Sequence, residues 1–205
     1  MHALEVLLGG SVGPPETGFE VAYVAPDGTE LRRPLADVWA VAFEHALPVR
    51  AFTSYRRQRN LPGRWWSATT GGHVGYESWL ERDQVMLLDF DPAVVGISSQ
   101  PFWLFWAASG GRPVSHAPDC FARRDDGAAV VVDCRPAERR RPRDVAKFDA
   151  TEAACAEVGW SSGWWGPRTR WWSATSGGWR VTGTPVTGWS RLPRGCGKCS
   201  PSRWR

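Results

Sequence analysis

The chain has 205 residues, 42% of them hydrophobic, and a formal net charge of +4. This length and composition fit one core-bearing domain and give no reason to expect a disordered or fibrous protein. No run approaches the roughly 20 apolar residues of a membrane helix, and the N-terminus has no basic leader, so we expect a cytoplasmic protein without membrane contact. Five cysteines without regular spacing favour free thiols over disulfides.

The basic charge is confined to one end of the chain. Residues 1–160 hold 17 Lys and Arg against 21 Asp and Glu, whereas residues 161–205 hold eight basic residues and no acid. A net basic charge that lies entirely in a tail does not indicate a DNA groove in the body. Any nucleic-acid function must therefore be argued from motifs.

An extension with a β-hairpin is expected at the N-terminus, over residues 1–53. Residues 19–24 alternate as a strand, a Pro-Asp-Gly turn follows, and residues 30–34 form the returning strand. A short helix is expected over residues 37–45.

The next segment, residues 54–73, is rich in Arg, Gly, Trp and Ser and shows no period, which predicts a loop or an extended arm. Its basic side chains are interleaved with aromatic ones, an arrangement that can hold the phosphates and bases of DNA. An arm that packs its tryptophans on the body is an equal alternative. The candidate DNA-binding residues are Arg56, Arg57, Arg59 and Arg64.

A mixed sheet with helices on its faces is predicted for residues 74–160. Helices are expected over residues 76–89 and 144–158, the first with Trp79, Leu80, Met86 and Leu87 buried and the second with Val145, Phe148, Cys155 and Val158 on one face. Strands are expected at residues 94–98, 102–107, 116–123 and 128–135. A turn is predicted between the first two strands, and an Asp-Asp-Gly turn joins the last two.

The tail, residues 161–205, contains seven Trp, one Leu, no Ile and no acid, and no helical or strand period. Loss of one G after the Trp160 codon of a GC-rich gene would explain the Trp excess. The restored frame begins EFRLVG, which alternates as a strand. We therefore expect a frameshifted, unstructured tail that lacks the strand due after the second helix. An Arg/Trp segment that stacks on single-stranded bases is the alternative.

Two further patterns in the sequence are weak. The RWWSATTGG of residues 64–72 is nearly repeated as RWWSATSGG in residues 170–178, but nothing flanking the two copies matches, and we interpret the repeat as coincidence. The CGKC of residues 196–199 has the spacing of half a zinc site, and the chain has no second close pair of cysteines to complete it.

Clustered acids in the body are candidates for a hard-cation site. Metal-assisted phosphodiester hydrolysis needs carboxylates for the ion and a cationic group for the phosphate. Asp119 follows a proline before a tight turn, and a hairpin brings it close to the next strand, where Asp133 and Arg135 share one face. Glu77 and Glu81 share one helix face and can supply another ligand. His116 is expected on the opposite face of its strand, in a packing role.

The segments YESWLERDQVMLLDFDPAVVGISSQP and HAPDCFARRDDGAAVVVDCRP resemble the TnsA family of transposase endonuclease subunits. The resemblance covers about 90 residues and implies a restriction-endonuclease-like fold with a Mg²⁺ (or Mn²⁺) site. By position, Glu81 matches the helix Glu of the family, with Glu77 its rival, Asp119 matches the metal-binding Asp, and Asp133 matches the strand acid. Arg135 stands where the family has Lys.

The resemblance implies DNA cleavage at transposon ends together with a partner transposase subunit. In the implied site Asp119, Asp133 and the Cys134 carbonyl hold the ion, Glu81 completes its shell, and Arg135 neutralises the phosphate. Arginine remains charged and cannot act as a general base. A pseudo-nuclease that binds DNA or the transposase, and a nuclease of repair or restriction, are the alternatives.

Overall fold

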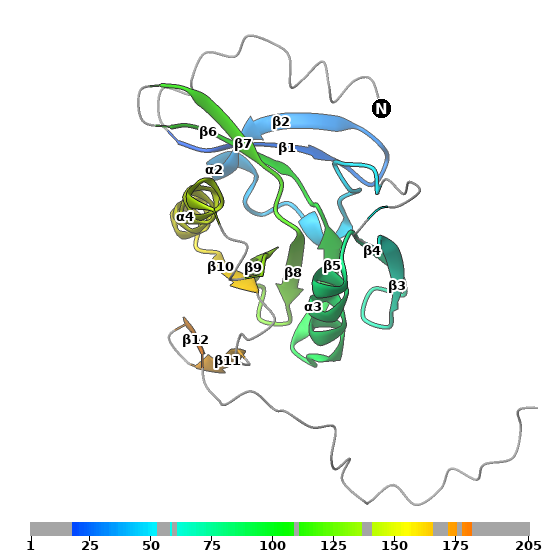
Figure 1. Ribbon diagram of the computed structural model, residues 1–205. Coiled ribbons are helices and arrows are strands. Elements are labelled where there is room, and N and C mark those ends of the chain that lie inside the picture. Colours follow the sequence, from blue (N-terminus) through cyan, green and yellow to red (C-terminus); the bar gives the residue numbers. More distant parts are fainter. Residues whose placement is uncertain are drawn as a thin grey trace, which may run out of the picture. The chain divides into compact units, whose positions relative to one another are not determined.

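The structure is a computed structural model that describes residues 18–52, 58, 61–108, 111–136, 141–165, 172–175 and 178–181. These residues form a mixed α/β fold with two four-stranded sheets, two hairpins and few helices (Figure 1). The described residues up to Trp165 belong to one compact unit, and β11 (Trp172–Thr175) and β12 (Gly178–Val181) belong to a second. No described helix is both long and apolar enough to cross a bilayer.

The first sheet has the order β2-β1-β6-β7, with every neighbouring pair antiparallel. Its strands are β1 (Glu20–Val24), β2 (Glu30–Pro34), β6 (Trp103–Ala107) and β7 (Pro113–His116). The pairing of β1 with β2 confirms the predicted N-terminal hairpin.

The helix expected over residues 37–45 is wrong in extent. The chain forms α2 (Leu35–Val38) and then a separate 3-10 turn, η1 (Phe43–His45). The interruption lets the Phe43 ring enter the core, where it is fully buried and makes edge contacts with four aromatic rings at 5.1 to 5.8 Å. Those rings come from both sheets and from the segment after α4, and they belong to Tyr23, Phe102, Phe121 and Trp160.

The second sheet has the order β10-β9-β8-β5. Its edge strand β10 runs parallel to β9, and the other neighbouring pairs are antiparallel. Its strands are β5 (Val94–Ser99), β8 (Cys120–Arg124), β9 (Ala129–Cys134) and β10 (Ser161–Trp165). The helix α4 (Pro142–Glu157) makes the crossover from β9 to β10. One face of this sheet packs on the Phe43 cluster, and the other packs on α3 (Trp79–Phe90).

Two expected strand arrangements are wrong. The strands expected at residues 94–98 and 102–107 are present as β5 and β6, but they enter different sheets. The strand expected at residues 116–123 is divided between β7 and β8, with residues 117–119 crossing from one sheet to the other. In both places a proline removes a ladder donor and turns the chain, so a continuous strand is not available.

The buried faces of the helices also differ from expectation. The Ser78 side chain caps α3, and the buried residues of that helix are Glu81, Gln84, Val85 and Leu88, whereas Trp79 is 53% exposed. In α4 the buried residues are Thr151, Ala154 and Cys155, which confirms the prediction for Cys155, whereas Val145 is 40% exposed. Both buried faces were predicted from the positions of apolar residues, but the buried faces of these helices also carry polar residues.

A hairpin stands in the second half of the segment expected to be a loop or arm, residues 54–73, of which residues 54–57 and 59–60 lie outside the described residues. The strands β3 (Gly63–Ser67) and β4 (Gly72–Tyr76) pair antiparallel. The carboxylate of Asp89, near the end of α3, accepts hydrogen bonds from the Trp65 indole, the Ser67 hydroxyl and the Thr69 backbone at 2.7 to 2.9 Å. This carboxylate fastens the hairpin to the helix.

The expectation of an unstructured tail is wrong for Ser161–Trp165, which pairs with β9 as β10. A strand at a sheet edge depends on backbone donors and acceptors, which SSGWW supplies whatever its side chains are. Both copies of the near-repeat lie in hairpins, but in different registers: Trp66 pairs with His73, whereas Trp172 pairs with Val181. The rest of residues 161–205, including CGKC, lies outside the described residues.

We expect Asp89→Ala to lower the free energy of unfolding by about 1–3 kcal/mol at pH 7, because several donors lose a charged acceptor that is only partly buried. Burial raises the pKa of Asp89, but hydrogen bonds from Ser67, Thr69 and Trp65 outweigh it and hold the pKa well below its ordinary value. The stabilisation is therefore complete above about pH 4 and is lost as the pH falls towards the folded-state pKa. Urea titrations at several pH values measure this, and Asp83→Ala, on the same helix, should show no comparable loss.

A second prediction tests the frameshift. Replacing residues 161–165 by the restored-frame sequence EFRLV should raise the free energy of unfolding by about 1–2 kcal/mol, because Ser162→Phe buries apolar area and Gly163→Arg removes a flexible residue from a strand. Thermal denaturation compares the two chains. Equal or lower stability of the substituted chain would contradict the frameshift hypothesis.

Candidate functional site

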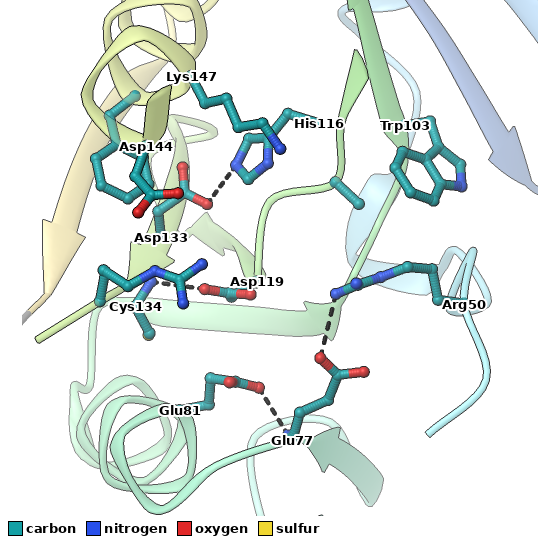
Figure 2. A pocket seen from close by; sticks show the side chains of 13 residues that line it. Arg50, Glu77, Glu81, Trp103, His116, Asp119, Asp133, Cys134, Asp144 and Lys147 are labelled. Carbon is teal, nitrogen blue, oxygen red and sulfur yellow. Dashed lines mark hydrogen bonds and ion pairs between the residues drawn. The ribbon is translucent and has the colours of Figure 1, made fainter. Parts of the chain in front are cut away.

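A pocket of about 250 Å³ lies at the edge of the second sheet where β8 begins and β9 ends (Figure 2). The antiparallel pairing of Cys120 with Val132 brings these two strand ends together. The first turn of α3 approaches from one side, and the first turns of α4 approach from the other. The pocket is lined by Arg50, Glu77, Glu81, Trp103, His116, Ala117, Asp119, Asp133, Cys134, Arg135, Asp144, Lys147 and Phe148.

All four residues predicted for the site line this one pocket: Glu81, Asp119, Asp133 and Arg135, with the rival Glu77 beside them. The candidate DNA-binding residue Arg64 lies apart from the pocket, exposed on β3. Arg56, Arg57 and Arg59 lie outside the described residues.

Asp119 lies just before β8 and is the most perturbed acid of the pocket. Its Oδ2 accepts a hydrogen bond from the backbone N–H of Cys134 at 2.7 Å. Burial, and then the nearby carboxylates of Asp133 and Glu81, raise the pKa of Asp119 well above its ordinary value. Both effects favour the protonated form of Asp119, and a cation would have to displace that proton.

Glu81 serves as part of the helix cap as well as lining the pocket. Its two oxygens accept hydrogen bonds from the Glu77 backbone N–H at 2.7 Å and from the Ser78 hydroxyl at 2.8 Å. Burial is the main cause that raises the pKa of Glu81. The Glu77 carboxylate is free of the cap and instead forms an ion pair with Arg50 at 3.2 Å. Both helix acids therefore line the pocket, Glu81 bonded within the helix cap and Glu77 paired with Arg50.

The packing role expected for His116 is wrong. His116 lines the pocket, and its Nε2 lies 2.7 Å from Oδ1 of Asp133, with both side chains largely buried. The expectation was wrong because residues 117–119 are not part of a strand. The alternation of side chains between the two faces of a strand therefore does not extend from His116 to Asp119. His116 lies on a strand of the first sheet and Asp133 on a strand of the second, and nothing in the sequence signals contact between them.

Sequence reasoning also missed four other pocket residues: Arg50, Trp103, Asp144 and Lys147. Arg50 precedes a segment without periodicity, and Trp103 lies on a strand of the other sheet, so neither has a local pattern that points to the pocket. Asp144 and Lys147 occupy the first turns of α4 at helical spacing. The helical spacing of these two charged residues, in the segment that follows Arg135, was the one signal in the sequence that they could belong to the site.

The charge of the pocket favours a cation. Five carboxylates and three basic side chains line it, an excess of two negative charges that one divalent ion would balance when all are ionised. Burial raises the thiol pKa of Cys120 and of Cys134 well above the ordinary value, so both remain protonated and the available donors are oxygens. Oxygen donors suit Mg²⁺ or Mn²⁺.

The carboxylates are at present held by local donors rather than gathered as ligands. Among the described residues, no three His, Cys, Asp or Glu side chains stand in the arrangement of a metal site. Within the same part of the chain, Asp119 and Asp133 each accept a hydrogen bond on one oxygen only, which leaves the other oxygen for a ligand role. The donor set of carboxylate oxygens is of the kind that a hard cation prefers. No family model and no characterised protein matches the sequence.

Proposed function

We propose that this protein is a Mg²⁺- or Mn²⁺-dependent endodeoxyribonuclease of the restriction-endonuclease-like class. The observation that carries the proposal is the convergence of Glu81, Asp119, Asp133 and Arg135 on one pocket, although they come from three separate parts of the chain. The excess of carboxylates and the cations at the rim are what metal-assisted cleavage of a phosphodiester requires.

The order of elements around the pocket supports this class. The helix α3 is followed by β5, β8 and β9, then by α4 and a further parallel strand, β10. The strands β6 and β7 are an excursion between β5 and β8 that pairs with the N-terminal hairpin. A helix, three strands, a helix and a further strand make up the core expected of a restriction-endonuclease-like nuclease.

The roles of the residues follow from their positions. Asp119 and Asp133, with the Cys134 carbonyl, would hold the cation, and Glu81 would complete the shell once its carboxylate leaves the Ser78 hydroxyl. A bound divalent cation supplies charge neutralisation and an activated water. His116 holds Asp133 in place through its hydrogen bond. Because the proton must leave Asp119 before it binds a cation, the affinity for Mg²⁺ should increase as the pH rises.

The cations of the pocket divide into fixed charges and one titratable group. Arg50 and Arg135 remain charged and suit the negative charge of a scissile phosphate. Among the described residues, Lys147, on α4, is the only lysine that lines the pocket. It can exchange a proton, which neither arginine can do. The replacement of Lys by Arg at position 135 therefore leaves one amine for proton transfer at this site.

A place in transposition is proposed from the resemblance to the TnsA family alone. In that setting the protein cuts one strand at each transposon end, and a partner transposase subunit cuts the other. A nuclease of repair or restriction would use the same pocket with other partners. The genes next to this one on the chromosome distinguish these settings.

Arg135 supports a second candidate function, that of a pseudo-nuclease which binds DNA or the transposase partner without cutting. Arginine at this position can hold a phosphate but cannot act as a base. In that case the pocket binds DNA but lacks metal-dependent turnover, so cleavage assays separate the two proposals.

We expect Asp119→Ala to abolish Mg²⁺-dependent nicking of supercoiled plasmid, because an essential oxygen ligand is lost. Glu81→Gln should also abolish nicking while it keeps an acceptor for the α3 cap, so that its thermal stability stays close to that of the unsubstituted chain. Asp83→Ala, an exposed acid on α3, is the matched control. Unchanged nicking by Asp119→Ala would refute the site, and loss in Glu77→Gln with full activity in Glu81→Gln would move the helix ligand by one turn.

For position 135 we expect a directional result. Arg135→Lys should keep or raise the rate of nicking, whereas Arg135→Ala should lower it by on the order of a hundredfold or more, as the loss of a transition-state donor does. Plasmid nicking and DNA binding are measured on the same preparations. If all three chains bind DNA and none cuts it, the pseudo-nuclease is the correct function.

A further inference from the structure

One face of the β3–β4 hairpin carries aromatic and basic side chains towards solvent. Arg64 and Trp66 on β3 point to this face, together with His73 on β4, and all three are exposed. Trp66 is 59% exposed and forms a T-shaped pair with His73 at 5.1 Å, so more than half of the side-chain surface is open to solvent. The opposite face of the hairpin is packed against the rest of the protein, since Val74 lies in the core and the Trp65 indole donates a hydrogen bond to Asp89.

Phe52 covers part of this face and lies two residues after a residue of the pocket. A Cβ on Gly75 would collide with the ring of Phe52, so Phe52 lies on the side of the hairpin that Arg64, the pairing partner of Gly75, also occupies. Two residues earlier in the chain, Arg50 lines the pocket. We name Phe52, Arg64, Trp66 and His73 the hairpin face. It lies on the side of the hairpin opposite to Trp65 and Val74, which face Asp89 and the core.

Charge identifies what the hairpin face can bind. Between Glu44 and Glu77 the sequence holds five arginines and no acid, in a body that is otherwise acidic. Basic side chains next to an open aromatic ring suit phosphates and unpaired bases, because every base has a face that can stack. A hairpin that Asp89 fastens to α3 presents these groups without a large ordering cost.

We propose that the hairpin face binds the DNA strand that leaves the pocket, with an unpaired base stacked on Trp66 and a phosphate held by Arg64. The inference rests on the proposed nuclease, because it places the strand relative to that pocket. It assigns the RWWSATTGG segment, which the site itself does not use, to holding the DNA next to the point of cleavage.

The experiment measures binding and cleavage separately. Fluorescence anisotropy in EDTA, where metal-dependent cutting cannot occur, gives the Kd of the full chain for a labelled single strand of about 16 nucleotides and for the matching duplex. We expect Trp66→Ala to weaken single-strand binding by about five- to 150-fold and Trp66→Phe to recover most of it. Arg64→Ala should reduce the slope of log K against log salt by about 0.7 for the single strand.

The matched control is Trp79→Ala. Trp79 is similarly exposed, at 53%, but lies on α3, where Arg82 covers its ring at 4.0 Å. Binding by Trp66→Ala equal to that of the unsubstituted chain, or an equal loss in Trp79→Ala, would overturn the proposal and favour a protein partner for the hairpin face. Plasmid nicking in Mg²⁺ tests the nuclease independently: binding that depends on Trp66 without nicking refutes only the cleavage, whereas nicking without a Trp66 effect refutes only the hairpin face.

Discussion

The antiparallel pairing of β8 with β9 is the interaction on which the pocket depends. It brings the residue before one strand next to the last residue of the other, and the N–H of Cys134 then donates to Asp119. The helices on the two faces of the sheet both begin at this edge, so their first turns add Glu81 from one side and Asp144 from the other. Without this register the acids would point to different edges of the sheet.

Bringing acids together in a half-buried space is unfavourable, and the structure shows how the charges are tolerated. Burial and neighbouring carboxylates favour the protonated form of Asp119, Glu81 is satisfied by donors of the helix cap, and Asp133 shares a hydrogen bond with His116. Each of these arrangements is local, and on the proposed function a divalent cation would replace it. A purely structural cluster would gain more stability from apolar residues of similar size. This comparison favours a ligand-binding role for the acids.

The parts of the fold that could be predicted from sequence are those set by neighbours in the chain. The hairpin of β1 with β2 and the closeness of Asp119 to Asp133 follow from alternation and turns. The buried face of α3 was mispredicted because it includes Glu81 and Gln84, which are polar. Glu81 is buried because it lines the pocket, and hydrophobicity does not predict this position. His116 and Arg50 escaped detection because they reach the pocket from another sheet and from an irregular segment, through contacts that no local period encodes.

Gln100 shows how that irregular segment is held to the site. Its φ of 47° is unusual for a residue with a side chain, and it is followed by Pro101, so the conformation costs on the order of 1–3 kcal/mol. In return its N–H donates to the Asp119 carbonyl and its own carbonyl accepts from the N–H of Val49, both at 3.0 Å. One strained residue thus joins the segment that carries Asp119 to the segment that carries Arg50. Strain that the surrounding structure maintains at a pocket edge is typical of functional sites, where it fixes groups that packing alone leaves free to move.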